Sequence, residues 1–140
     1  MKILFLLKKT FEMDQSEEKP ATYRISIQNP KECPTFDYIK QGIKTVEGRK
    51  NSEKYQKIKI DDIILFECNN ETIKTRVTYV HKYLTLKDYL KKETLELTLP
   101  NVGTVRNGIT IYNNWSTQKE RDKLRKKYGF GFLGIGIRIE

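Results

Sequence analysis

The chain has 140 residues, of which 37% are hydrophobic and 32% are charged, and its formal net charge is +9. This length fits one domain with one buried core, and the balance of apolar and charged residues excludes a disordered or a membrane protein. The surplus of Lys and Arg favours polyanionic partners, because a cation beside a phosphate releases a condensed counterion. A solvated, lysine-rich surface is the plainer interpretation of the same charge.

The numbers of cysteines and histidines and the lengths of the apolar segments limit the possible classes of protein further. Two cysteines, Cys33 and Cys68, are too few for a disulfide framework or a metal set, and they predict reduced thiols. His81 is the single histidine, so we expect no metal site, and no cofactor motif is present. Residues 1–9 predict a buried strand rather than a secretion signal. No segment approaches the roughly 20 apolar residues that span a bilayer, so we expect a cytoplasmic or nuclear protein without membrane contact.

The first half of the chain predicts strands around one short helix. Residues 22–28 alternate between apolar and polar side chains, and Pro34 and Gly42 are suited to the two ends of a helix. In order, the expected elements are a strand at 22–28, a helix at 34–41, an extended stretch at 44–50, a β segment at 58–68 broken at Asp61-Asp62, a hairpin turn at 69–72 and a return strand at 73–81.

The second half predicts helices and one closing strand. The expected elements are a helix at 86–92 capped by Thr85 and continued by 95–99, a helix within 105–115, a charged helix at 118–128 capped by Ser116 or Thr117 and ended by Gly129, and a strand at 130–139. Because a hairpin-length turn joins the strands at 63–68 and 73–81, a parallel α/β fold is excluded. The fold class is therefore α+β, with a small mixed or antiparallel barrel and inserted helices.

Three motifs follow one another in a recognisable order. The helix that ends at Gly42 leads into G-x-K-x-x-E-x-R, formed by Gly42, Lys44, Glu47 and Arg49. Residues 60–66 then read I-D-D-I-I-L-F, and the chain closes on the β run at 134–139. In this order the chain resembles the ASCH domain, a member of the PUA-like superfamily.

The resemblance covers roughly residues 36–139, so we expect a single ASCH/PUA-like domain over residues 1–140, built as a small PUA-like β-barrel. It implies an RNA-related role, because PUA-like domains bind RNA or modified bases in a cleft beside the barrel. Some ASCH proteins resemble amidohydrolases that act on acetylated cytidine, and some are reported as ribonucleases.

An enzyme is the less favoured interpretation. The amidohydrolase pattern is K-x-x-T, and Glu47 stands where the nucleophilic Thr is needed. Thr45 is adjacent to Lys44, so in an extended strand the two side chains point to opposite faces. We therefore expect an RNA- or nucleotide-binding module that uses a basic cleft beside the barrel, in RNA processing or transcription-related regulation. An enzyme that acts on RNA or a modified nucleoside, with Lys44 and Glu47 as its catalytic residues, and a protein-interaction module remain the alternatives.

The residues expected to bind the ligand are Lys44, Thr45, Glu47, Arg49, Lys50 and Tyr55. An Arg can fork onto a phosphate or stack on a base, a Lys can meet a phosphate, and a carboxylate can accept from an exocyclic amine. In an extended segment Glu47 and Arg49 share one face and Lys44 lies on the other, unless a bulge forms at Gly48. A structural ion pair between Glu47 and Arg49 is the plainer interpretation.

The aromatic residues divide differently. Tyr55 lies among lysines, which suits single-stranded nucleic acid, although a packed anchor in a solvated loop fits equally well. Tyr112 and Trp115 have helical spacing and are expected to pack rather than to stack on a base. The bias towards Lys, Ile and Asn suits a large DNA virus or an AT-rich cell. The sequence leaves that choice open, together with the RNA target and the oligomeric state.

Overall fold

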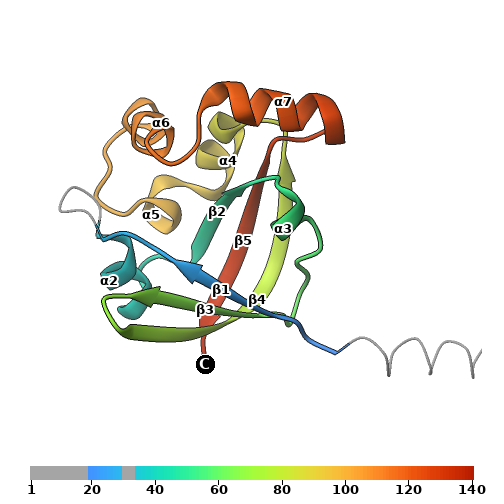
Figure 1. Cartoon of the computed structure of the whole chain (residues 1–140). Coiled ribbons are helices and arrows are strands. Elements are labelled where there is room, and N and C mark those ends of the chain that lie inside the picture. The colour runs from blue at the N-terminus through green and yellow to red at the C-terminus, as the bar shows by residue number, and fades with distance from the viewer. Residues whose placement is uncertain (1–18, 30–33) are drawn as a thin grey trace, which may run out of the picture.

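The computed structural model describes residues 19–29 and 34–140, and its centre is a five-stranded mixed sheet that forms half a barrel (Figure 1). The predicted strand at 1–9 and Cys33 lie outside the described residues. The strands are β1 Thr22–Ser26, β2 Val46–Lys50, β3 Ile63–Cys68, β4 Glu71–Tyr83 and β5 Phe132–Ile139. The helices are α2 Thr35–Lys40, α3 Glu53–Gln56, α4 Leu86–Glu93, α5 Leu95–Thr98, α6 Val105–Asn113 and α7 Gln118–Tyr128. This architecture confirms the predicted α+β class.

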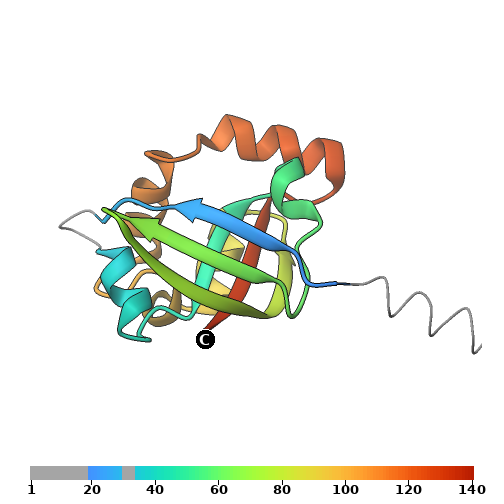
Figure 2. The same cartoon turned by 60° about the horizontal axis from the view of Figure 1, so that its bottom comes forward.

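The strand order of the sheet is β1-β3-β4-β5-β2. The β1–β3 pair is parallel, whereas the pairs β3–β4, β4–β5 and β2–β5 are antiparallel. The two end strands of the sheet are therefore β1 and β2. Figure 2 shows β1 and β3 crossing in front of β2 and β5, which is the curvature of the half-barrel.

The sheet separates two apolar clusters. One cluster includes Ile25, Phe66 and Ile135, and the other, which lies against α4, includes Tyr89 and Phe132. Strand β5 contributes to both clusters, and its residues 132–137 are all buried. Side chains alternate between the two faces of a strand, so a central strand packed on both faces becomes an unbroken apolar run.

Local signals explain the ends of most elements. The Thr85 side chain accepts from the Asp88 N–H at the start of α4, and Thr117 and Glu120 form a capping box at the start of α7. Gly129 has a φ of 91° and ends α7 in the left-handed conformation that glycine adopts readily. Asn69 and Asn70, with φ values of 48° and 66°, turn the β3–β4 hairpin at the predicted place.

Three details of the predicted elements differ. Thr94 has a φ of 73°, which interrupts the helix and separates α5 from α4. Residues 58–62 form a turn before β3 rather than a strand, because the buried Asp62 carboxylate accepts from the backbone N–H groups of Ala21 and Lys59. The one-turn helix α3 was not expected, and it places Tyr55 against the core.

The helices lie in two places around the sheet. In Figure 1, α4, α5, α6 and α7 gather on one side, while α2 lies beside the tip of the β3–β4 hairpin. Lys40 of α2 pairs there with Glu71 at 2.7 Å. Within the described residues, no helix has the length and apolar character needed to cross a membrane.

Candidate functional site

A cavity of about 410 Å³ lies between the two end strands of the sheet, and we call it the seam pocket. Its walls come from residues 26–28 at the end of β1, from β2 together with Lys44, from Tyr55 of α3 and from residues 114–116 after α6. Because β1 and β2 do not pair with each other, the half-barrel stays open here and leaves room for a ligand.

Five of the six predicted site residues line the seam pocket: Lys44, Glu47, Arg49, Lys50 and Tyr55. The sixth, Thr45, has a structural role in the described part of the chain. Its backbone N–H donates to the Leu97 carbonyl at 3.1 Å, and its own carbonyl accepts from the Ile137 N–H at 2.9 Å. Thr45 therefore attaches the start of β2 to α5 and β5.

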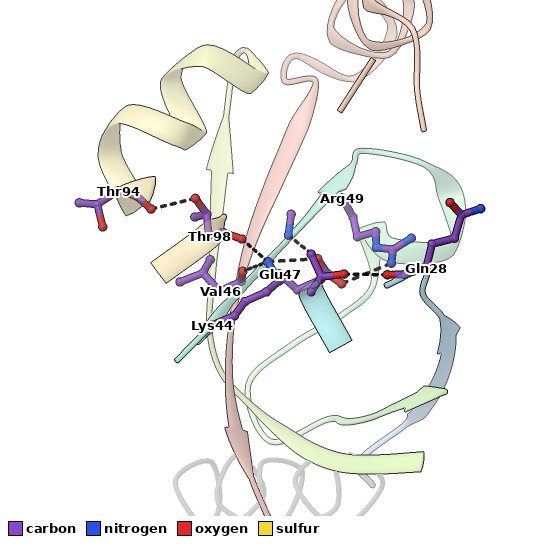
Figure 3. A network of polar contacts seen from close by, with 9 residues as sticks. Gln28, Lys44, Val46, Glu47, Arg49, Thr94 and Thr98 are labelled. Atoms are coloured by element: carbon purple, nitrogen blue, oxygen red, sulfur yellow. Dashed lines mark hydrogen bonds and ion pairs between the residues drawn. The ribbon is translucent and has the colours of Figure 1, made fainter. Parts of the chain in front are cut away.

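Lys44 is a buried cation inside the wall of the pocket. Its side chain is 1% exposed, and its ammonium donates to the Val46 carbonyl at 2.6 Å and the Thr98 carbonyl at 2.5 Å (Figure 3). It also lies 3.7 Å from a carboxylate oxygen of Glu47. The expectation that Lys44 and Glu47 point to opposite faces was wrong, because β2 begins only at Val46 and strand alternation does not apply to Lys44.

No bulge is needed to bring these charges together. The register of β2 with β5 runs without a shift from Val46 opposite Gly136 to Lys50 opposite Phe132. The register shift of this sheet lies instead in β4, between Val77 and Tyr79.

Glu47 is a buried carboxylate held by two kinds of donor. Its side chain is 7% exposed, one oxygen accepts from the Gly48 N–H at 3.0 Å, and the other accepts from the Arg49 guanidinium at 3.3 Å. Burial pushes the pKa of Glu47 up, but the charges of Arg49 and Lys44 and these hydrogen bonds outweigh it, so the pKa lies below its ordinary value. Glu47 is therefore ionised at neutral pH.

The Arg49 guanidinium has two partners within the protein. Its guanidinium pairs with Glu47 and lies 5.6 Å from the centre of the Tyr55 ring, a cation–π arrangement. Among the described residues, the buried Arg49 Nε has no hydrogen-bond acceptor. The guanidinium lines the seam pocket, so a fixed, charged donor group faces any ligand there.

The other two predicted residues that line the pocket, Tyr55 and Lys50, also have partners within the protein. Tyr55 is buried and packs against the rings and cations around it, with Tyr23 at 6.5 Å and Lys54 at 5.3 Å, as the anchor interpretation predicts. Lys50 pairs with Glu120 of α7 at 2.8 Å, which joins the end of β2 to the first turn of that helix.

Sequence reasoning missed the wall formed by residues 114–116. Tyr112 is buried, as its helical spacing predicts, but α6 ends at Asn113 and leaves Trp115 beyond the helix, 41% exposed. The signal that was available was the short polar Asn113-Asn114 pair, which favours a helix end over continued packing.

A second group of titratable side chains lies on the α4 side of the sheet. The buried Glu93 carboxylate accepts from the Tyr79 hydroxyl at 2.7 Å and from the Tyr83 hydroxyl, and lies 2.8 Å from His81 Nδ1. The His81 ring is exposed and stacks on Tyr79 with centroids 4.3 Å apart. In the described chain no group of three or more His, Cys, Asp or Glu side chains is placed to hold a metal ion.

This cluster makes folding sensitive to acid. Burial raises the pKa of Glu93, but hydrogen bonds from Tyr83, His81 and Tyr79 outweigh it, so its pKa lies below the ordinary 4.5. A carboxyl group with a lowered folded-state pKa stabilises the fold above about pH 4.5 and loses that contribution as the pH falls through the folded value. We expect Glu93→Gln to lose less stability than wild type on acidification, measured by urea unfolding at a series of pH values. Exposed Glu96→Gln is the control, and parallel pH profiles for all three proteins would contradict the expectation.

The half-barrel and its seam pocket define a small domain with a buried Lys–Glu–Arg network at its open edge. The chain matches the family model of the ASCH domain over residues 32–130, and it belongs to the ASCH domain family. The sequence prediction of the family is thereby confirmed.

Two solved structures are similar to this chain over most of its length. The crystal structure of the hypothetical protein PH0355 is 30% identical with a TM-score of 0.69, over 85% of this chain and 99% of that one. The solution NMR structure of protein PF0455 from Pyrococcus furiosus is 31% identical with a TM-score of 0.62, over 84% of this chain and 96% of that one. Among curated proteins there is no significant match.

Proposed function

We propose that this protein binds RNA and that its seam pocket takes one unpaired nucleotide. The observation that carries the proposal is the pair formed by ionised Glu47 and Arg49 in the wall of the pocket. A carboxylate beside a guanidinium offers an acceptor next to a donor, and nucleobase edges present the complementary pattern. Glu47 accepts from an exocyclic amine in this arrangement, while Arg49 donates to a ring nitrogen or carbonyl.

Family membership and charge support the same proposal. The ASCH domain family is generally thought to bind RNA. The net charge of +9 supplies the sequence-independent attraction that precedes contact with a base. The cavity volume of about 410 Å³ falls within the range of pockets that take small organic ligands of nucleoside size.

The position of Lys44 favours a binding module over an enzyme. Its ammonium is already held by two backbone carbonyls and lies beside Glu47, all inside the protein. A lysine that activates a nucleophile must exchange a proton with the substrate, whereas this one orients the Glu47 carboxylate. We therefore assign Lys44 the role of orienting the Glu47 carboxylate. Arg49 is assigned the role of contacting the ligand.

The test compares RNA binding by variants of Arg49, and the fluorescence anisotropy of dye-labelled single-stranded RNA measures that binding. Arg49→Met keeps an unbranched apolar side chain but removes the guanidinium and its two parallel N–H donors. We therefore expect the variant to bind RNA about 5- to 150-fold more weakly, which is the usual effect of losing one bidentate contact to a base. Arg49→Lys keeps the charge and is expected to recover only part of the loss. The control is Arg106→Met, which removes the same charge from an exposed position on α6.

Two results would overturn this proposal. One is equal affinity of the Arg49→Met and Arg106→Met variants for RNA, with unchanged thermal unfolding. The other is a wild-type protein that shows no salt-dependent binding to any single-stranded or structured RNA, because phosphate contacts weaken steeply as salt is added.

A further inference from the structure

Trp115 occupies an unusual place for the single tryptophan of the chain. It lines the seam pocket while the residue is 41% exposed, and its ring makes an edge-to-face contact with the ring of Tyr112, with centroids 5.1 Å apart and ring planes at 84°. An indole that lines a pocket and stays partly exposed presents an aromatic face that a planar ligand can cover. Tyr112 itself is buried, so the core fixes one of the two rings in this contact.

A buried arginine fixes the short connection that carries Trp115. Arg121 of α7 is 5% exposed, and its guanidinium donates to the Ser116 carbonyl, to the Ser116 hydroxyl at 3.0 Å and to the Asn113 side-chain carbonyl at 2.7 Å. These acceptors are uncharged, and burial lowers the pKa of Arg121. For packing alone a leucine would be the less costly residue, since a buried cation loses its hydration.

The hydrogen bonds of Arg121 flank the tryptophan on both sides. Asn113 precedes Trp115 by two residues and Ser116 follows it directly, so the backbone that presents the indole is held at both ends. A second attachment lies nearby. Glu120 closes the capping box of α7 and pairs with Lys50 of β2, which joins this connection to the strand that carries Glu47 and Arg49.

We propose that Trp115 is the residue on which the bound nucleotide stacks its base, and that Arg121 is the positioning residue that holds the indole at the pocket. The inference rests on the proposed function and narrows the ligand to an unpaired nucleotide with an accessible base face. A duplex does not fit this role, because its bases are already stacked on one another. Glu47 and Arg49 contact the edge of the base, and Trp115 covers its face.

The single tryptophan makes the proposal directly measurable. With excitation at the red edge of the tryptophan absorption band, where the eight tyrosines absorb little, intrinsic fluorescence reports on Trp115, so a short single-stranded RNA should quench the emission as it binds. An abasic strand of equal length carries the same phosphates without bases and should leave the emission unchanged. A blunt duplex of the same sequence should also fail to quench it.

Variants separate stacking from a general effect on the fold. We expect Trp115→Ala to bind single-stranded RNA about 5- to 150-fold more weakly by anisotropy of the labelled RNA, the range for loss of one stacked base, and Trp115→Phe to recover most of the affinity. Arg121→Met should fold cooperatively but show a smaller maximal quench at saturating RNA. Arg121→Lys should restore part of that quench, since it keeps a donor towards Ser116 or Asn113.

The outcomes are distinguishable from those of the proposed function. If wild type and Trp115→Ala bind RNA equally, or the abasic strand quenches as strongly as RNA, stacking on Trp115 is overturned while RNA binding through Arg49 stands. If Arg121→Met retains the full quench, the positioning role of Arg121 is overturned. If labelled RNA does not bind wild type at all, both proposals fall.

Discussion

Glu47→Ala is expected to destabilise the fold by about 3–5 kcal/mol, the usual effect of removing one partner from a buried ion pair. The variant removes the carboxylate that the buried Lys44 ammonium and the Arg49 guanidinium both contact. The ammonium keeps its two backbone carbonyls but loses the opposite charge that compensates its burial. Urea unfolding at neutral pH, with linear extrapolation, measures the change.

The control for this variant is the surface pair between Lys40 and Glu71, whose side chains are both 57% exposed. Glu71→Ala should leave the urea midpoint unchanged within error, because water and salt screen exposed charges. A double variant, Glu47→Leu with Lys44→Met, should be more stable than Glu47→Ala, since it removes the buried ammonium together with the carboxylate. Only the Arg49 guanidinium, whose side chain is 27% exposed, then loses its ion pair. A loss for Glu47→Ala no larger than that for Glu71→Ala would contradict the structural role of the pair.

Gly48→Ala is expected to destabilise the fold by about 1–3 kcal/mol and to weaken RNA binding, because it forces a methyl group into a filled space. A Cβ at Gly48 would lie 2.6 Å from Tyr89 Cζ and 2.7 Å from the Tyr112 hydroxyl oxygen. Tyr89 is fully buried, so it has no room to retreat. Any shift of Tyr112 also moves the surface on which Trp115 rests.

The matched control is Gly103→Ala, since a Cβ there meets no atom within 4 Å. It should change stability by no more than about 0.5 kcal/mol, as surface substitutions usually do. Thermal unfolding of both variants, together with RNA anisotropy, separates the steric effect from the general effect of replacing a glycine. Equal unfolding midpoints for Gly48→Ala and Gly103→Ala would contradict the expected clash.

Local patterns were enough to predict most elements of this protein. Turn and cap residues act on backbone groups only a few residues away, so their effect can be predicted from the local sequence. Examples are the two asparagines of the hairpin, the threonine caps of α4 and α7, and Gly129. The G-x-K-x-x-E-x-R motif also pointed to the correct family, and three of its residues, Lys44, Glu47 and Arg49, line the seam pocket. A motif of this kind predicts which residues belong to the site, but it does not predict the distances and contacts between them.

The tertiary structure alone decided how those residues meet. The Lys44 ammonium lies beside Glu47 and donates to the Thr98 carbonyl of α5, a helix that lies far along the chain from β2. Glu93 acquires its three partners only when α4 packs against β4. The pocket lies between β1 and β2, the unpaired ends of the strand order, and Trp115 lines it from the connection after α6, where Arg121 donates to Asn113 and Ser116. Pairings between distant segments depend on the packing of the whole core, which short-range sequence patterns do not encode.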